Sequence, residues 1–297
     1  MKKNTLKKIK ILSRILIGYY KRFLIDFGLV KIRHLPVKDN TPQVVVSLTS
    51  YGRRVKSVVY YTLISILAQE ILPNKIVLWL DNNNWTIDNL PDKLKHLRSY
   101  GVEFRFCKDI KSYKKLIPTI ALHPNDLIIT IDDDIIYNKD LIGSLLFLHS
   151  QFPHNIITSG ARYPLLKNEN QFTAYNRWHT SESYEEKPLY IMPYGGSGTL
   201  YPPASLHEDA TDSDLAQQLC PTADDIWFWI MAKRVGTSHK VVNNNLEFGY
   251  AFDDLYQYLH RGSALTHSNS KQNHNDTQLQ GILDHYKLNL SELRQNS

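Results

Sequence analysis

The sequence predicts an α/β fold in which helices flank a mostly parallel central sheet. From residue 44 onward, short runs that are apolar throughout alternate with longer segments of helical pattern. Strands of a parallel sheet are continuously apolar because both of their faces are covered, and helices form the crossovers between them. The hydrophobic content of 42% over 297 residues is enough for one large core.

The expected elements begin after a linker at residues 34–43, which contains two prolines. In the first half we expect strands at 44–50, 75–81, 102–107 and 127–134, with helical segments at 55–69, 91–100 and 114–122. From residue 151 onward the chain is richer in Gly, Pro, Tyr and polar residues. We expect one clear helix there, at 222–236, and a tail after about residue 260 that is polar and then weakly helical.

Basic residues are concentrated near the N-terminus. Of the 35 Lys and Arg residues, ten lie in residues 1–34 with a single acid, Asp26, so this segment carries +9. The remaining 25 basic residues face 28 acids, which leaves −3 for the rest of the chain. A basic balance confined to one end argues against a nucleic-acid-binding surface on the fold. The two cysteines, Cys107 and Cys220, form no disulfide framework and fit a reducing compartment.

Residues 1–34 are expected to contain a basic amphipathic helix. Its apolar residues recur at spacings of three or four, at Leu6, Ile9, Leu12, Leu16, Tyr19, Phe23 and Phe27. Its basic residues fall mostly on another face, at Lys3, Lys7, Lys10, Arg14 and Lys21. The longest charge-free apolar run, 15–20, is too short to span a bilayer, and no signal-peptide cleavage pattern follows it.

Two interpretations of this helix stay open. It could lie on an anionic membrane surface, which we favour and which would make the protein cytoplasmic and peripheral on the inner face of the cell membrane. Alternatively, it packs on its own domain and exposes a solvated basic face.

Polar side chains follow several of the expected strands where each strand ends. Thr49, Ser50 and Tyr51 follow the first strand, and Asp81 ends the second. Three aspartates end the fourth strand, at 132–134. The carboxyl ends of parallel strands meet at one edge of a sheet, so we expect these groups to converge there.

The aspartate run predicts a metal site. In a strand, Asp132 and Asp134 would share one side of the pleat about 7 Å apart, and Asp133 would point to the other side and matter least. Carboxylate oxygens suit Mg²⁺ or Mn²⁺, which take one or two carboxylates together with substrate phosphates. The alternative is a solvated strand end. His267 is the histidine that we expect to complete the metal shell, unless it is a surface residue.

Two further segments are candidates for the site. Asp224 and Asp225 lie where a helix begins, so one of them could be a general base, or both could only complement the helix dipole behind a Thr222 cap. The segment 192–203 contains Gly195, Gly196 and Gly198, but it lacks the spacing of a dinucleotide fingerprint or of a P-loop. It predicts a constrained loop that lines a site, with a plain turn as the alternative.

Taken together, these motifs resemble the nucleotide-sugar-dependent glycosyltransferases of the GT-A fold. They are a Thr-Ser-Tyr turn after the first strand, an aspartate after the second, Asp-x-Asp after the fourth, a glycine-rich segment and an acidic pair that opens a helix. The strings GGSGTLYPP and ADDIWF resemble in particular the family-two-like bacterial enzymes that build O-antigen, capsule or lipopolysaccharide glycans. The resemblance covers residues 42–280 approximately and implies a Rossmann-like sheet.

The resemblance also implies roles for individual residues. Thr49, Ser50, Tyr51 and Arg53 would border the nucleotide, and Asp81 would accept a hydrogen bond from uracil if the donor is a UDP-sugar. Asp134 would ligate the metal, Asp132 would assist through the ribose or a water, and Asp133 would be among the cofactor-binding residues. The glycine loop, with Gly196 and Gly198, would lie beneath the donor sugar and the acceptor. Asp225, or failing that Asp224, would deprotonate the acceptor; this Asp-Asp pair departs from the usual Glu-Asp.

The implied organisation is a single domain at 42–297 behind the basic segment 1–34. Residues 42–150 would form the nucleotide-binding half, and 151–297 the acceptor half and tail. The expected activity is a metal-dependent, inverting transfer of a sugar to a glycan or lipid-linked acceptor. The alternatives are a metal-dependent nucleotidyltransferase or phosphohydrolase, and a non-enzymatic membrane-surface binding protein.

Overall fold

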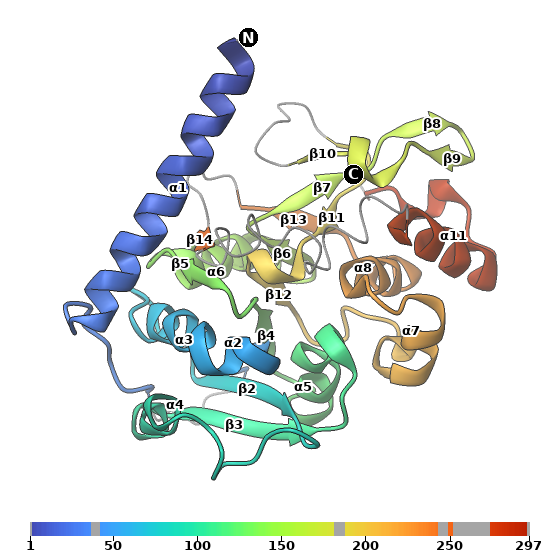
Figure 1. Ribbon diagram of the computed structural model, residues 1–297. Coiled ribbons are helices and arrows are strands. Elements are labelled where there is room, and N and C mark those ends of the chain that lie inside the picture. The colour runs from blue at the N-terminus through green and yellow to red at the C-terminus, as the bar shows by residue number, and fades with distance from the viewer. Residues whose placement is uncertain (1, 37–41, 181–187, 243–248, 252–273, 296–297) are drawn as a thin grey trace.

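The computed structural model describes residues 2–36, 42–180, 188–242, 249–251 and 274–295 (Figure 1). The side chains of the N-terminal helix are described from Ser13 onward, except that of Arg14. His267 lies outside the described residues. No helix in these parts of the chain is both long and apolar enough to cross a bilayer.

A seven-stranded sheet forms the centre of the protein. Its strands are β1 (Val44–Thr49), β2 (Lys75–Asp81), β3 (Val102–Cys107), β4 (Leu127–Thr130), β6 (Ile156–Thr158), β12 (Thr199–Tyr201) and β13 (His239–Val241). They are ordered β13-β6-β12-β4-β1-β2-β3. Only β12 runs antiparallel to its neighbours. The predicted α/β class with a mostly parallel sheet is therefore confirmed, and strands from both halves of the chain build the same sheet.

Helices cover the sheet (Figure 1). They are α2 (Gly52–Ser57), α3 (Val59–Leu67), α4 (Asp92–His96), α5 (Ile117–Leu122), α6 (Leu141–Gln151), α7 (Ser213–Leu219), α8 (Asp224–Arg234) and α11 (His274–Tyr286). Short 3₁₀ turns add η1 (Leu97–Tyr100), η2 (Lys111–Lys115), η3 (Tyr175–Arg177), η5 (Gly195–Ser197), η6 (Glu208–Thr211) and η7 (Leu290–Leu293). The helix expected at 55–69 is divided at Val58, where φ is −119°.

Smaller pairings complete the fold. β5 (Ile135–Tyr137) pairs with β14 (Gly249–Ala251), and β8 (Leu166–Asn168) pairs with β9 (Gln171–Phe172). A three-stranded sheet consists of β10 (His179–Thr180), β7 (Ala161–Tyr163) and β11 (Met192–Pro193).

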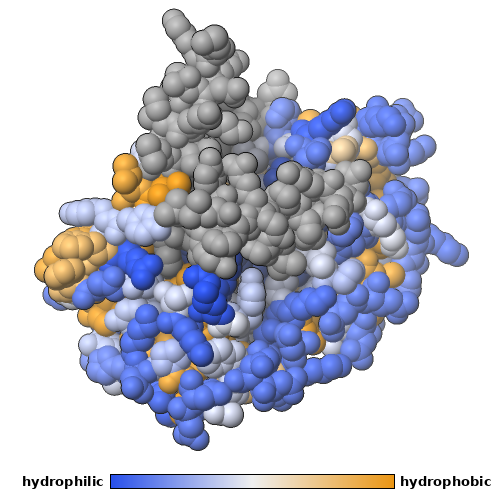
Figure 2. Space-filling view, in the orientation of Figure 1, coloured by the Kyte–Doolittle hydropathy of each residue, from blue (hydrophilic) through white to orange (hydrophobic). Residues whose placement is uncertain are grey.

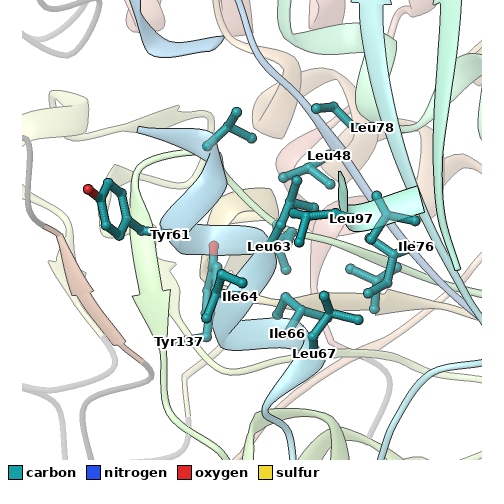
Figure 3. Packing of buried hydrophobic residues seen from close by; sticks show 14 of the residues in the cluster. Leu48, Tyr61, Leu63, Ile64, Ile66, Leu67, Ile76, Leu78, Leu97 and Tyr137 are labelled. Atoms are coloured by element: carbon teal, nitrogen blue, oxygen red, sulfur yellow. The ribbon is translucent and has the colours of Figure 1, made fainter. Parts of the chain in front are cut away.

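Two large hydrophobic clusters hold these layers together. In the first, Leu63 and Ile66 of α3 pack against Leu48 of β1 and Leu78 of β2 (Figure 3). The second surrounds α8 and includes Trp227 and Trp229, both almost fully buried. Burying such side chains stabilises the fold by about 1.5–3 kcal/mol each. The apolar runs of the sequence thus supply cores on both sides of the sheet.

The fourth strand is shorter than expected. It ends at Thr130, and the chain then turns through Asp133 and Asp134 before β5 begins at Ile135. The prediction of a strand over 127–134 is therefore wrong at its end. Repulsion among three adjacent carboxylates, and the cost of burying them in a sheet, favour a turn there.

The aspartate turn lies at the point where the strand order reverses. The chain moves from β1 outward to β2 and β3, and then returns to the opposite side of β1 as β4. In open α/β sheets, ligands bind in the crevice outside the carboxyl ends of the strands at such a switch point. The ends of β1 and β4 thus form the topologically favoured ligand site.

The N-terminal helix α1 (Lys2–Asp26) contacts the body through a mixed face that includes Lys21, Ile25 and Asp26. Lys21 lies 4.8 Å over the ring of Tyr250, and Tyr61 donates a 2.7 Å hydrogen bond to Asp26. Ile25 is buried in the first core cluster. The apolar stripe of Leu16, Tyr19, Tyr20, Phe23 and Phe27 is instead 41–67% exposed. In Figure 2, large apolar patches lie on the side of the molecule where α1 runs in Figure 1.

Candidate active site

Asp133 is the most buried of the three adjacent aspartates, with 4% of its surface exposed. Its carboxylate accepts a 2.5 Å hydrogen bond from Ser50 and pairs with Arg54. The hydroxyl of Thr62 donates to its backbone oxygen. The expected alternation, with Asp133 alone on the far side of a pleat, is wrong because these residues form a turn. Asp133 fastens the end of β4 to β1 and α3.

Arg54 holds two of the aspartates at once. Its Nη1 lies 2.7 Å from Asp133 and its Nη2 lies 2.9 Å from Asp134. Burial alone would lower the pKa of Arg54, but Asp134 and Asp133 outweigh it and hold that pKa well above its usual range. Arg53, the arginine singled out from the sequence, is exposed. The sequence does not distinguish these two adjacent arginines. In the fold, Arg54 lies on the side of α2 that faces the aspartates, and Arg53 does not.

Lys115 connects the two acidic clusters. Its ammonium lies 3.0 Å from Asp132 Oδ1 and 3.2 Å from Asp224 Oδ2, and only 6% of its side chain is exposed. Burial would lower the pKa of Lys115, but Asp132, Asp224 and Asp225 outweigh that effect and hold the pKa well above its usual range. Lys115 therefore remains a buried cation between segments far apart in sequence. Sequence reasoning missed it because it lies in the lysine-rich connector.

Asp224 and Asp225 occupy the first turn of α8, as the sequence predicts, but they face different partners. Asp224 accepts a 2.8 Å hydrogen bond from Ser112, whereas Asp225 Oδ1 accepts one of 2.9 Å from the backbone N–H of Gly195. The expected Thr222 cap is wrong, because Ala223 precedes the helix and Thr222 bonds with Gln278. The aspartates are therefore not simply dipole complements behind a capped end.

Asp225 has the properties of a base at neutral pH. Burial, and then the negative charge of Asp224, raise its pKa to about 7, while Lys115 and the Gly195 N–H oppose this rise. A carboxyl with such a pKa is half ionised at physiological pH and readily exchanges a proton. Groups with perturbed pKa values next to specific charge partners are typical of functional sites.

The glycine-rich loop packs directly onto these acids. A Cβ added to Gly196 would lie 1.9 Å from Asp132 Oδ2, and one added to Gly195 would lie 2.8 Å from Asp225 Oδ1. Gly198 has a φ of +98°, which L-residues rarely adopt. Thr130 donates a 2.7 Å hydrogen bond to the carbonyl of Gly195. The loop is thus a constrained wall of the site, as expected, and only glycine permits the contact with Asp132.

The residues expected to border a nucleotide lie along the β1 and β2 ends. Thr49 donates a 2.9 Å hydrogen bond to the backbone of Trp79, and Tyr51 is 53% exposed. Ser50 is fully buried on Asp133. Asp81 is 4% exposed, and its Oδ1 accepts hydrogen bonds from both the backbone and the side chain of Asn84. Tyr51 is therefore an exposed aromatic side chain at this edge of the sheet. The nucleotide contacts expected of these residues stay predictions.

The carboxylates of Asp132 and Asp134 have the chemistry of Mg²⁺ or Mn²⁺ ligands. The carboxylate of Asp132 remains 46% exposed although Lys115 pairs with it, and Asp134 lies in the same turn. Acids outnumber cations across the two clusters, so the site carries surplus negative charge. Within the described residues, no three His, Cys, Asp or Glu side chains are grouped as a complete metal shell. Mg²⁺ and Mn²⁺ need fewer protein ligands than that, because they keep water and take substrate phosphates.

An open hollow elsewhere on the surface offers less chemistry. It has a volume of about 600 Å³ and lies at the β8–β9 hairpin, lined by Asn168, Glu169, Asn170, Gln171 and Gln280. Glu169 is its sole ionisable side chain among these. The cluster of paired acids and cations lies beside the ends of β1 and β4 instead, and it is the candidate active site.

Comparison with known proteins gives a distant likeness only. No protein-family model and no curated protein sequence matches the chain. Staphylococcus aureus TarS is similar with a TM-score of 0.45 and 12% identity, over 83% of this chain and 72% of that one. 4-Diphosphocytidyl-2C-methyl-D-erythritol synthase is similar with a TM-score of 0.46 and 9% sequence identity, over 74% of this chain and 98% of that one.

A third solved structure is glucosyl-3-phosphoglycerate synthase from Mycobacterium tuberculosis in complex with Mn²⁺, UDP and phosphoglyceric acid. Its TM-score is 0.30 with 10% identity, over 43% of this chain and 50% of that one. At TM-scores and identities this low, none of these likenesses carries an argument about activity. The function of this chain is therefore argued from its own site.

Proposed function

We propose that this protein is an inverting glycosyltransferase of the GT-A type that moves a sugar from a nucleotide-sugar donor, UDP-linked, to a hydroxyl of a glycan or lipid-linked acceptor. One observation carries the proposal. Asp225 has a pKa of about 7, to which the charges of Lys115 and Asp132 contribute. Lys115 joins Asp132 to Asp224, the residue that directly precedes Asp225. Sugar transfer from a diphosphate requires a base together with a group that neutralises the leaving phosphate, and the carboxylates beside Asp225 would hold a metal for that purpose.

In this mechanism Asp225 accepts the proton of the acceptor hydroxyl. The hydroxyl oxygen bonds to the anomeric carbon while the bond from that carbon to the diphosphate oxygen breaks with its electron pair. The N–H of Gly195 fixes the Asp225 carboxyl through Oδ1. Lys115 orients the two acidic clusters relative to each other. Attack opposite the leaving group inverts the anomeric centre.

Asp132 and Asp134 would hold Mn²⁺ or Mg²⁺. When bound, the metal supplies charge neutralisation for the diphosphate leaving group. Arg54 keeps Asp134 oriented through its 2.9 Å ion pair. We assign His267 as a third ligand only on the sequence, since it lies outside the described residues.

The donor would bind at the half of the domain formed by residues 42–150, as expected from the sequence. Tyr51 offers an exposed ring at the end of β1, Thr49 and Arg53 flank it, and Asp81 lies at the end of β2. The acceptor would approach from residues 151–297, which contribute the glycine loop and Asp225. A role in bacterial surface polysaccharide synthesis belongs to this proposal.

The proposal is tested by a panel of nucleotide sugars with and without Mn²⁺ or Mg²⁺. We expect UDP to stabilise the protein against heating only when the metal is present, and a UDP-sugar to be slowly hydrolysed. We expect Asp134→Ala to lose the metal-dependent shift. A shift with a nucleoside triphosphate and release of pyrophosphate would instead favour the nucleotidyltransferase alternative. No shift with any nucleotide would refute the transferase.

The N-terminal helix supports a membrane-surface location. Its polar side chains Lys21 and Asp26 contact the body, whereas its apolar stripe faces away from the body. This orientation disfavours the alternative in which the apolar face packs on the domain. An exposed apolar stripe on a segment with a charge of +9 complements an anionic membrane. The protein would therefore be peripheral on the inner face of the cell membrane.

Substitution of this stripe should release the protein from membranes. We expect the triple variant Leu16→Ser, Tyr20→Ser, Phe23→Ser to lose most of its binding to phosphatidylglycerol vesicles in a flotation assay, because each exposed apolar side chain contributes buried area on insertion. Phosphatidylcholine vesicles should bind the wild type weakly, since they lack the negative surface.

A matched control removes three exposed apolar side chains elsewhere. Phe147, Leu189 and Val235 are 70%, 57% and 45% exposed. Their substitution by Ser should leave vesicle binding unchanged. Equal flotation of the two triple variants would show that α1 is not the membrane-binding element.

A further inference from the structure

Arg162 is held between two tyrosine rings next to the proposed base. It lies in the middle of β7, and its guanidinium is 4.6 Å from the ring centre of Tyr175 and 5.7 Å from that of Tyr194. Tyr194 directly precedes Gly195, whose N–H binds Asp225. An arginine stacked on aromatic faces is held in place while its edge remains available to a ligand.

The rings that hold Arg162 are themselves fixed relative to α8. The backbone N–H of Tyr175 donates a 2.8 Å hydrogen bond to Asp276, and its ring packs 4.8 Å from Trp178. Trp178 in turn lies 6.3 Å from Trp229, on the same helix as Asp225. The pKa of Tyr175 is raised by burial, lowered by Arg162 and raised by Asp225, so both charges act on this one ring.

Arg162 has donors that the described protein does not use. Its guanidinium shares a side-chain hydrogen bond with Tyr175, but its Nε is buried without a hydrogen-bond partner. Among the described residues no carboxylate forms an ion pair with it. Buried donors are normally paired, because an unpaired one costs about 1–3 kcal/mol. A guanidinium that is built into a rigid wall and lacks an acid partner matches the geometry of a carboxylate or phosphate.

We propose that Arg162, clamped by Tyr175 and Tyr194 beside Asp225, binds an anionic group of the acceptor and so makes the enzyme select acidic acceptors. The assignment of this anion to the acceptor rests on the proposed function, whereas the presence of an anion site does not. The group is a planar or tetrahedral oxyanion, either the carboxylate of an acidic sugar or a phosphate. A fork of N–H donors next to the base would anchor this group while the acceptor hydroxyl faces Asp225.

The test uses the full-length protein and three small glycosides of one sugar. They are methyl glucoside, methyl glucuronide and methyl glucoside 6-phosphate, with binding followed by ligand-observed NMR. We expect at least one charged probe to bind about tenfold or more tighter than the neutral one, as one charged hydrogen-bonded contact allows. The preferred charged probe identifies the carboxylate or the phosphate as the natural group.

Variants assign this preference to Arg162. Arg162→Gln should reduce binding of the charged probe to the level of the neutral one, and Arg162→Lys should retain an intermediate preference, since it keeps the charge but not the fork. Arg177→Gln is the matched control, because Arg177 is exposed on the neighbouring turn η3 and should behave like the wild type. The Lys variant also tests the site if the Gln variant fails to fold.

Two results would overturn the inference. One is a wild type that does not prefer either charged probe over the neutral one, and the other is a charged preference that persists in Arg162→Gln. UDP affinity should be the same in wild type and Arg162→Gln. Absence of UDP binding in the wild type, together with an Arg162-dependent charged preference, would refute the donor assignment and leave the anion site standing.

Discussion

Replacing Asp225 with Asn is expected to lower the transfer rate by about 10²- to 10⁴-fold, the usual contribution of a general base. Asn has nearly the same shape, and its Oδ1 can still accept the hydrogen bond from the Gly195 N–H, so the loop should keep its position. UDP binding should remain intact because Asp225 is not assigned to the donor. Single-turnover transfer and UDP titration measure the two effects separately.

The pH dependence of the transfer rate and of the stability provides a second test of the role of Asp225. Only the ionised carboxyl accepts a proton, so the wild-type rate should rise as the pH passes upward through about 7. Stability should change in the opposite direction. The folded pKa lies above the ordinary value of 3.8, so the folded state binds more protons and loses stability as the pH rises from about 4 to 7.

Asp225→Asn should therefore be more stable than the wild type at pH 8 while it is nearly inactive. Its residual rate should lack the inflection near pH 7. A variant that kept the full rate, or the wild-type pH profile, would show that Asp225 is not the base. In that case Asp224, 8% exposed and paired with Lys115, would be the next candidate.

Lys115→Met is expected to cost about 3–5 kcal/mol of unfolding free energy, as breaking a buried ion pair typically does. The substitution leaves Asp132 and Asp224 without the cation that lies 3.0 and 3.2 Å away. It also removes the positive charge that lowers the pKa of Asp225. The midpoint of the pH–rate profile should consequently move above 7.

Urea unfolding at pH 5 and pH 8 tests the electrostatic origin of this loss. The destabilisation should be larger at pH 8 than at pH 5, because Asp225, with a pKa of about 7 in the wild type, is more ionised there and has lost the opposing charge of Lys115. Lys108→Met is the matched control, because Lys108 and its partner Asp214 are 76% and 83% exposed at 3.5 Å. Such surface pairs contribute about 1 kcal/mol or less. Similar losses in the two variants would refute a special role for Lys115.

Much of the fold and some of the site follow from local sequence patterns. The strands β2 and β3 have the expected boundaries, 75–81 and 102–107, because continuous apolar runs between turn residues define them. The ends of β1, β2 and β4 carry the polar residues that were expected there. The glycine-rich segment was recognisable because close approach and positive φ both require glycine.

The partners of the acids could not be read from the sequence. Asp132 to Asp134 suggested a strand and a metal, but strand pairing decides where β4 ends, and it ends at Thr130. The sequence contains 35 Lys and Arg residues, and nothing in their spacing distinguishes Arg54, Lys115 or Arg162 from the others.

By itself, then, the sequence determined the fold class, the boundaries of β2 and β3, and the positions of the acids at the ends of β2 and β4 and at the start of α8. Only the tertiary structure decided which cations balance those acids, and that Asp225 titrates near neutral pH. The physical reason is the distance along the chain over which each effect acts. Hydrophobic periodicity is local in the chain, whereas burial and charge pairing depend on segments such as Lys115 and Asp224 that meet only when the sheet is complete.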